Sequence, residues 1–131
     1  MERVVIVLDT HAWIWWLDGS KKLPLRTRRR IDRAKAIGVC AISCWEVARL
    51  VVHGRLKLDR QVHEWVAGAL RAPRVELLAL EPDIAVAAAT LGAFGGDPAD
   101  HMIVATARDR KAPLATADER IADSGFVDVV W

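Results

Sequence analysis

Four acidic residues stand where the sequence predicts helix starts: Asp9, Glu46, Asp100 and Asp118. Three of them (Asp9, Glu46 and Asp118) each follow a predicted strand, and a parallel sheet collects such residues at its carboxyl edge. Carboxylates that meet in one crevice repel each other unless they are protonated or neutralised by cations. Oxygen-only clusters of this kind suit Mg²⁺ or Mn²⁺, which bind carboxylates and water. The spacing does not place Asp100 in this crevice, because its helix does not follow a strand directly.

Most of these acids also have an interpretation in which they only shape the ends of helices. Asp9 could cap the helix that follows it, since Asp is favoured at the N-cap position. The spacing from Ser43 to Glu46 matches a capping box, in which Glu46 would bind only the Ser43 amide. Residues 116–119 form another capping box of the Thr-x-x-Glu type, which leaves Asp118 without a structural role.

The segment Asp97-Pro98-Ala99-Asp100 is also good helix-start chemistry. It places Asp97 at the N-cap, Pro98 at the first helical position and Asp100 at the third. An acidic side chain in the first turn is favourable because of the helix dipole, so neither acid requires a catalytic role. Taken singly, an acid at a helix start is more often a cap than a metal ligand, and only the set of four points to metal binding.

The elements that must position these acids alternate between strands and helices. The apolar run Val4–Leu8 is rich in β-branched residues, which is typical of a strand buried on both faces. The sequence predicts strands at 4–8, 38–42, 75–80, 113–115 and 126–131. It predicts helices at 10–17, 24–36, 43–53, 59–70, 82–94, 97–110 and 116–124. This alternation predicts a parallel, three-layer α/β fold, and no Gly-rich phosphate loop follows a strand.

The composition indicates one globular domain spanning residues 1–131. A hydrophobic content of 53% excludes a disordered chain. No apolar stretch has the length of a membrane span, and the N-terminal run lacks the pattern of a signal peptide. Cys40 and Cys44 have no second Cys/His pair nearby, as a structural zinc site would require, so we expect reduced thiols in a cytoplasmic protein.

Basic residues crowd one short segment although the net charge is only +2. The segment could be a solvated helix face, which is the usual meaning of such a charge run. It could equally be a surface that contacts RNA phosphates, because clustered Lys and Arg bind nucleic-acid backbones whatever their sequence. The candidate RNA-binding residues are Lys21, Lys22, Arg26, Arg28, Arg29 and Arg30, and the segment continues through Arg33 to Lys35.

Four motifs in order resemble those of PIN-domain ribonucleases, and most closely the VapC toxins of bacterial toxin–antitoxin pairs. They are Leu8-Asp9-Thr10-His11-Ala12, Ser43-Cys44-Trp45-Glu46-Val47, Asp97 to Ala107, and Thr116-Ala117-Asp118. Gly54-Arg55-Leu56-x-Leu58 also resembles a segment common in that family. The position after Asp100 is often Arg in such toxins, whereas this chain has His101 there. The difference affects a phosphate or structural contact at that position and leaves the set of four carboxylates complete.

The resemblance implies a PIN-like α/β/α fold with a five-stranded parallel sheet in the order 3-2-1-4-5. It implies Mg²⁺- or Mn²⁺-dependent cleavage of RNA to 5′-phosphate and 3′-hydroxyl ends, with Asp9, Glu46, Asp100 and Asp118 around the metal. Asp97 is an accessory acid in this scheme. Thr10 and Thr116 could support the carboxylates, although for Thr10 a helix start is the favoured interpretation.

The resemblance further implies a homodimer that an antitoxin protein silences. Trp13, Trp15 and Trp16 carry more apolar surface than one short helix can bury, and we expect the surplus to face a second copy or the antitoxin.

Other classes fit less well. A phosphoryl-accepting receiver domain should pair acids in its first loop and carry a Lys after the fifth strand. A phosphatase with an Asp nucleophile requires Asp-x-Asp, whereas His11 holds the second acidic position. A non-catalytic RNA-binding or scaffold domain is the remaining alternative, and the complete set of four acids argues against it.

Overall fold

A five-stranded parallel sheet forms the centre of the computed structural model, which describes residues 5–92 and 94–131. The strands are β1 (Val5–Leu8), β2 (Ala36–Cys40), β3 (Val75–Leu78), β4 (Leu114–Ala115) and β5 (Val129–Val130). Their order is β3-β2-β1-β4-β5, and each neighbouring pair is parallel. The predicted order is therefore confirmed, while Val4 of the predicted first strand lies outside the described residues.

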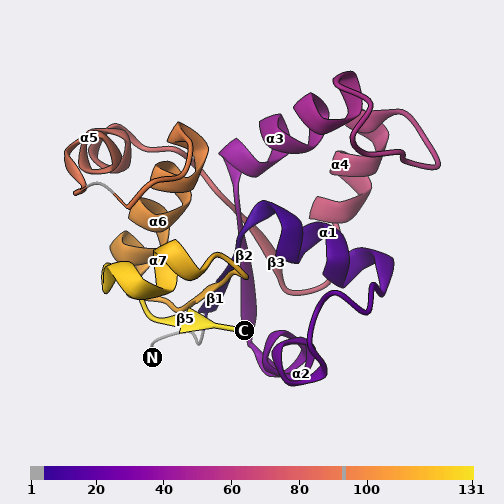
Figure 1. Cartoon of the computed structure of the whole chain (residues 1–131). Coiled ribbons are helices and arrows are strands. Elements are labelled where there is room, and N and C mark those ends of the chain that lie inside the picture. The colour runs from indigo at the N-terminus through magenta and orange to yellow at the C-terminus, as the bar shows by residue number, and fades with distance from the viewer. Residues whose placement is uncertain (1–4, 93) are drawn as a thin grey trace.

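Helices cover both faces of this sheet, as the three-layer prediction requires (Figure 1). One face carries α1 (Thr10–Asp18), α2 (Leu25–Arg33), α3 (Ala41–Val52) and α4 (Val62–Leu70). The other carries α5 (Pro82–Thr90), α6 (Pro98–Arg110) and α7 (Glu119–Ser124). None of the helices in the described ranges has the length and hydrophobicity that a transmembrane helix requires.

Alternation along β1 divides the core between the two faces. Ile6 and Leu8 pack in the cluster on the α1–α4 side, whereas Val7 packs in the cluster with α6 and α7. This is the period-2 geometry of a strand, and all three side chains are buried because helices cover both faces. Gly38 allows close packing in the neighbouring strand, since an ideal Cβ there would lie 2.6 Å from Leu78 Cδ1.

Several predicted boundaries were wrong. β2 begins at Ala36 and not at 38, so the following helix begins at Ala41 and Ser43 lies inside it. Asp59 does not cap α4, whose N-cap is Gln61; the Asp59 carboxylate instead pairs with Arg60 at 3.0 Å.

Other elements are shorter in the structure than the sequence predicts. α2 ends at Arg33 and α5 at Thr90, and β5 contains only Val129 and Val130.

Candidate active site

Five acidic side chains line one pocket of about 380 Å³ near the carboxyl ends of β1 and β4. Asp9 and Asp118 follow β1 and β4, Glu46 lies on α3, and Asp97 and Asp100 stand at the start of α6. The structure thus brings together all four predicted acids and the accessory one. It includes Asp100, which the spacing along the chain did not place.

Asp9 serves as a helix cap and a pocket residue at once. Its Oδ1 accepts a hydrogen bond from the Ala12 amide at 2.8 Å, which caps α1. Burial raises the pKa of the Asp9 carboxyl above its ordinary value, and the nearby Asp100 charge adds to the rise. The Thr116 hydroxyl and the Ala12 amide act in the opposite direction on this pKa. Capping therefore does not remove Asp9 from the acidic pocket.

Glu46 is held by a hydroxyl from another helix. The Thr10 hydroxyl lies 2.5 Å from Glu46 Oε1 and 3.0 Å from the Ser43 hydroxyl. Because Thr10 has one hydrogen and the carboxylate is the stronger acceptor, Thr10 donates to Glu46 and Ser43 donates to Thr10. The capping-box interpretation of Ser43 and Glu46 is therefore wrong, since the N-cap of α3 is Cys40. Thr10 begins α1 as expected, but it also positions a carboxylate.

The pKa of Glu46 is raised by burial in the first place and then by the charges of Asp97, Asp100 and Asp9, while the Thr10 hydrogen bond lowers it. The pKa of Asp100 is likewise raised, by burial and by the adjacent Asp97. Three carboxyls of one pocket thus have pKa values shifted in the direction that lowers negative charge. The pocket would accept a cation in place of protons.

Asp97 and Asp100 hold the N-cap and N3 positions that the sequence predicts, and in the structure they form a capping box. Asp97 Oδ1 accepts from the Asp100 amide at 3.0 Å, and Asp100 Oδ2 accepts from the Asp97 amide at 3.2 Å. His101 is directed elsewhere: its ring stacks on Phe94 with centroids 4.3 Å apart, and its Nε2 lies 3.2 Å from the Gly95 carbonyl oxygen. His101 is not among the residues that line the acidic pocket.

Asp118 has a structural role that the sequence did not indicate. It is the N-cap of α7, and both its carboxylate oxygens bind Arg120, with Nε 3.2 Å from Oδ1 and Nη2 2.9 Å from Oδ2. This contact lowers the pKa of Asp118. Thr116 does not cap the helix; its hydroxyl accepts from the Asp118 amide at 3.1 Å. The predicted capping box at Thr116 is therefore wrong.

The chemistry of this donor set fits a hard divalent cation. Carboxylate oxygens dominate the pocket, and such oxygens are the ligands of Mg²⁺ and Mn²⁺. Within residues 5–92 and 94–131, no three candidate ligands already converge on one point. Asp9 accepts from the Ala12 amide through Oδ1, whereas both carboxylate oxygens of Asp118 bind Arg120, so an ion at Asp118 would compete with that guanidinium.

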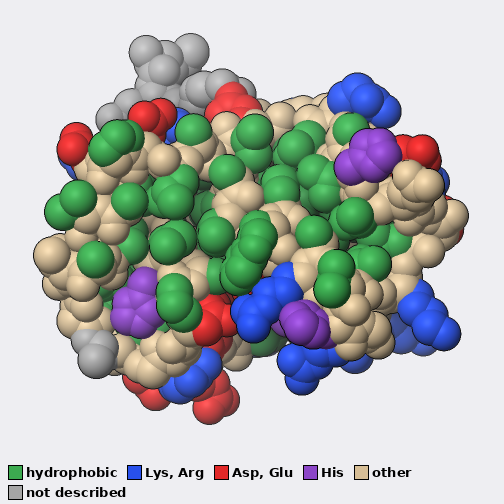
Figure 2. All heavy atoms as spheres, turned by 90° about the horizontal axis from the view of Figure 1, so that it is seen from above, with side chains coloured by type: hydrophobic (Ala, Val, Ile, Leu, Met, Phe, Trp, Pro, Cys, Tyr) green, Lys and Arg blue, Asp and Glu red, His purple; other side chains and the backbone are tan. Residues whose placement is uncertain are grey.

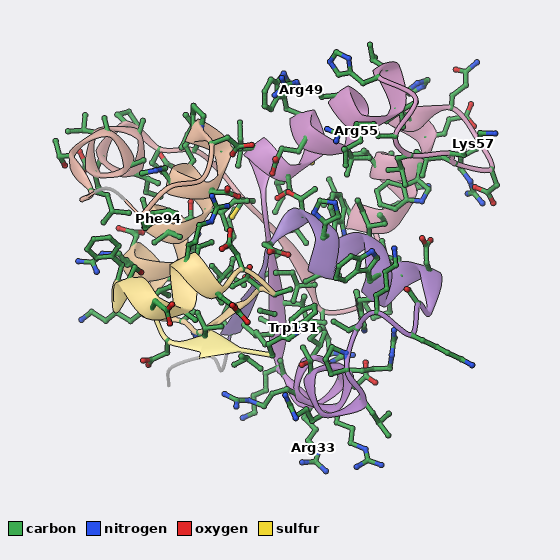
Figure 3. All side chains as sticks on the ribbon, viewed as in Figure 1. Arg33, Arg49, Arg55, Lys57, Phe94 and Trp131 are labelled. Carbon is green, nitrogen blue, oxygen red and sulfur yellow. The ribbon has the colours of Figure 1, made fainter. Side chains whose placement is uncertain are left out.

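The basic segment lies on and before α2, which leads into the amino end of β2 and projects away from α3 (Figures 1 and 3). Arg26 Nε donates to the Trp131 carbonyl at 2.7 Å, and Arg28 donates to the Trp16 and Trp15 carbonyls at 3.1 and 3.2 Å. Lys21, Arg29 and Arg30 are exposed. The Lys22 Nζ lies 5.7 Å from the ring centroid of Trp15, which lines the acidic pocket.

The tryptophans of α1 do not form one exposed patch. Trp13 is fully buried and packs edge-on against Trp65, with ring centroids 5.1 Å apart. Trp15 and Trp16 are half-buried, and Trp16 Nε1 donates to Asp32 at 3.1 Å. The expectation that all three tryptophans share a surplus surface was therefore wrong for Trp13.

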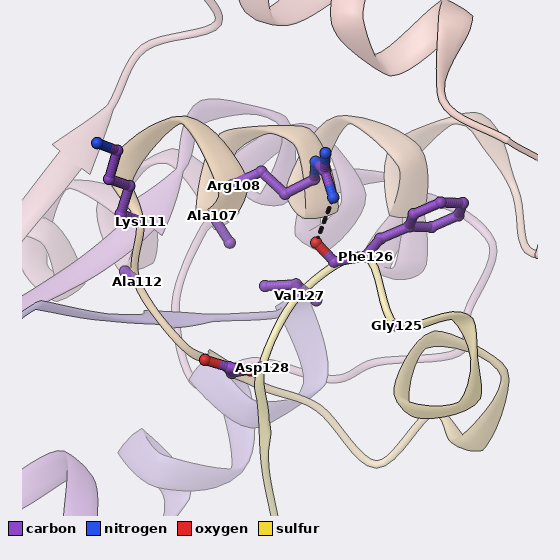
Figure 4. Close-up of a pocket in the computed structure, with 8 residues that line it drawn as sticks. All are labelled: Ala107, Arg108, Lys111, Ala112, Gly125, Phe126, Val127 and Asp128. Carbon is purple, nitrogen blue, oxygen red and sulfur yellow. Dashed lines mark hydrogen bonds between the residues drawn. The ribbon is translucent and has the colours of Figure 1, made fainter.

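A separate cavity of about 350 Å³ lies between α6 and the segment before β5 (Figure 4). Its Arg108 donates to the Phe126 carbonyl at 2.6 Å, and none of the five acids lines it. This cavity is not part of the acidic pocket.

Sequence reasoning missed Arg120 as a support of the acidic pocket, and although it named Thr10 and Thr116 as possible supports, it favoured a helix start for Thr10. Arg120 carried a usable signal, since it lies two residues after Asp118 at a helix start, within reach of the carboxylate. The contact between Thr10 and Glu46 joins residues 36 positions apart and left no signal along the chain.

A parallel sheet in this order, with acids gathered near the carboxyl ends of its central strands, defines the PIN-domain class of α/β proteins. The family model described as PIN domain matches residues 6–127, and the chain belongs to this family. The chain is 33% identical to ribonuclease VapC22 of Mycobacterium tuberculosis (strain ATCC 25618 / H37Rv) over 117 residues, which are 88% of this chain and 88% of that protein.

Solved structures of toxin–antitoxin complexes share the fold. VapBC2 from Rickettsia felis, bound to a DNA fragment from its promoter, matches with a TM-score of 0.70 at 15% identity, covering 97% of this chain and 98% of that chain. A toxin–antitoxin complex from Klebsiella pneumoniae matches with a TM-score of 0.68 at 18% identity, covering 96% of each chain.

Proposed function

We propose that this chain is a metal-dependent endoribonuclease and the toxin of a VapBC-type toxin–antitoxin pair. Mg²⁺ or Mn²⁺ binds Asp9, Glu46, Asp100 and Asp118, with Asp97 as an accessory acid. The observation that carries the proposal is the convergence of five acids from four parts of the chain on one pocket, in which three carboxyl pKa values are raised. The similarity to ribonuclease VapC22 supports RNA as the substrate.

The residues of this chain have distinct tasks in the proposed reaction. A bound divalent ion supplies a water molecule of lowered pKa and neutralises charge on the phosphate. Asp9 and Asp100 hold the ion, and Thr10 orients Glu46 through its hydrogen bond. A carboxyl with a raised pKa is suited to accept the proton that the attacking water loses. Arg120 binds both carboxylate oxygens of Asp118, so a divalent ion held by Asp118 would compete with this guanidinium.

The basic segment is proposed as an outer contact for longer RNA. Lys21, Lys22, Arg29 and Arg30 are exposed and are available to bind phosphates without reading the base sequence. Arg26 and Arg28 would have to release backbone carbonyls before they could contribute.

We propose that this protein acts in the cytoplasm and that its partners are an antitoxin protein and a second copy of this chain. An antitoxin arginine would compete with the metal for the acids, as a guanidinium binds a carboxylate through two hydrogen bonds. Arg120 already binds Asp118 in this way. Of the three tryptophans of α1, only Trp15 and Trp16 keep exposed surface that a partner could contact.

RNA cleavage by Asp9→Asn and Asp100→Asn variants tests the proposed reaction. Both changes remove a negative ligand at almost constant shape, and we expect the loss of Mg²⁺-dependent cleavage with the fold retained in circular dichroism. Cleavage by both variants at the wild-type rate would overturn the assignment. RNA binding without cleavage by the wild-type protein in Mg²⁺ and Mn²⁺ would favour the non-catalytic alternative.

A further inference from the structure

A second cavity, of about 370 Å³, adjoins the acidic pocket. His11, Glu46 and Asp97 line both cavities, so the two are continuous. The part beyond Glu46 is lined by Arg49, His53 and Arg55, and we call this part the basic groove. Figure 2 shows acidic, basic and histidine side chains next to one another on the face seen from above. Positive charge therefore lies directly beside the proposed reaction centre.

Helix α3 and its C-cap place an aromatic ring, a guanidinium and an imidazole along one face of the helix. Trp45, Arg49 and His53 are spaced by four residues, which places them along one face of the helix. With a rise of 1.5 Å per residue, His53 lies about 10 Å along the helix axis from Glu46. The Arg49 guanidinium lies 5.2 Å from the ring centroid of Trp45, and Trp45 is 52% exposed.

The turn after α3 brings the second arginine back to this face. Gly54 has φ of +70°, which a residue without a side chain adopts at little cost. The amides of Gly54 and Arg55 donate to the Val51 and Leu50 carbonyls at 3.0 and 2.8 Å. These bonds fold the segment against the last turn of α3, and Figure 3 shows Arg55 beside the helix that carries Arg49.

Both arginines keep their charge available. Across the part of the chain that the structure describes, no carboxylate forms an ion pair with Arg49 or Arg55. Both residues are exposed. By contrast, Arg26 and Arg28 on α2 donate to backbone carbonyls.

We propose that the basic groove binds the phosphates of single-stranded RNA next to the bond that is cut, through Arg49 and Arg55, while Trp45 stacks on a base. The inference rests on the proposed ribonuclease function and assigns the residues that hold the RNA strand beside the reaction centre. Guanidinium groups bind phosphate through paired hydrogen bonds, and an exposed aromatic ring offers a stacking surface for an unpaired base. His53 adds a further hydrogen-bond donor in the same line.

The test is binding of a fluorescent single-stranded RNA of six nucleotides to metal-free protein in EDTA, measured against salt concentration. For Arg49→Gln/Arg55→Gln we expect at least a 10-fold loss of affinity at 50 mM salt. The slope of log affinity against log salt should flatten by about 1.4, because each phosphate contact in a single strand contributes about 0.7. Trp45→Ala should weaken binding by about 5-fold or more, and Trp45→Phe should weaken it less.

Arg71→Gln/Arg110→Gln is the matched control, since it removes the same charge from two exposed arginines that do not line the basic groove. We expect less than a 3-fold loss for this control. Equal losses in both double variants, or an unchanged slope in Arg49→Gln/Arg55→Gln, would overturn the inference. A glutamate hexapeptide that binds the basic groove more tightly than the RNA would also overturn it, in favour of an acidic protein segment.

This experiment separates the basic groove from the proposed reaction. If the wild-type protein binds the RNA through Arg49 and Arg55 but never cleaves it in Mg²⁺ or Mn²⁺, the groove stands and the proposed hydrolysis fails.

Discussion

Replacing Thr10 with Val tests whether a hydroxyl positions Glu46 for metal binding. The change is almost isosteric at a side chain that is only 4% exposed, and it removes the donor that lies 2.5 Å from Glu46 Oε1. A hydrogen bond to a charged group contributes about 1.5–3 kcal/mol to stability. For a chain of 131 residues this corresponds to a fall in melting temperature of about 5–12 °C at pH 7.

Metal affinity should fall as well, because residues that orient a ligand typically change affinity or activity by about 10- to 100-fold. The assay is RNA cleavage over a Mg²⁺ titration, with thermal unfolding measured in parallel. The loss of stability should shrink near pH 4, where protonation of Glu46 removes the charge that the hydroxyl supports. Thr10→Ser keeps the hydroxyl and is the control.

The reasoning would be refuted if Thr10→Val kept both the wild-type Mg²⁺ requirement and the wild-type melting temperature. In that case Thr10 would only begin α1. An equal loss in Thr10→Ser, which keeps the hydroxyl but lacks the methyl, would show that this buried position tolerates no change of side chain, and the hydrogen bond to Glu46 would then not be the cause.

Three further outcomes are expected. Folding raises the pKa of Asp9 above 3.8, so the metal-free protein loses stability as pH rises through the pKa of the folded state. In EDTA at pH 8, Asp9→Asn should therefore have a higher melting temperature than the wild type. The same difference in melting temperature at pH 3 would contradict this. Gly38→Ala should cost about 1–3 kcal/mol in urea unfolding because of the contact with Leu78, whereas Gly68→Ala, with nothing nearer than 3.9 Å, should be neutral or stabilising. Burial raises the pKa of Cys40 to about 12, so iodoacetamide at pH 8 should modify Cys40 only in urea, as read from peptide fragment masses.

The parallel α/β alternation and the helix start at Asp97 could be predicted because local signals determine them, whereas the strand order was implied by the resemblance to PIN-domain ribonucleases. Alternating strands and helices allow few parallel arrangements, and Asp97-Pro98 followed by Asp100 specifies its own capping box. The start of α3 could not be predicted as well, since 38–42 and 36–40 are both apolar and only pairing with β1 selects the second range. That shift of two residues turned Ser43 from a supposed cap into a partner of Thr10.

The acidic pocket could be predicted only where an acid follows a strand. Asp100 enters it because α6 packs against both α5 and α3, and these contacts depend on the whole fold and not on local spacing. The tryptophans of α1 show the same limit: composition indicated surplus apolar surface, but Trp65, 52 positions after Trp13, was the partner that buried it.

The mutual repulsion of the carboxyls in the acidic pocket has an evolutionary consequence. A mutation that removes Asp9, Glu46 or Asp100 would abolish the proposed activity and also relieve this repulsion in the metal-free protein, so selection for stable folding and selection against toxicity act in the same direction. A gene released from its activity would therefore lose these acids early, before it lost its core.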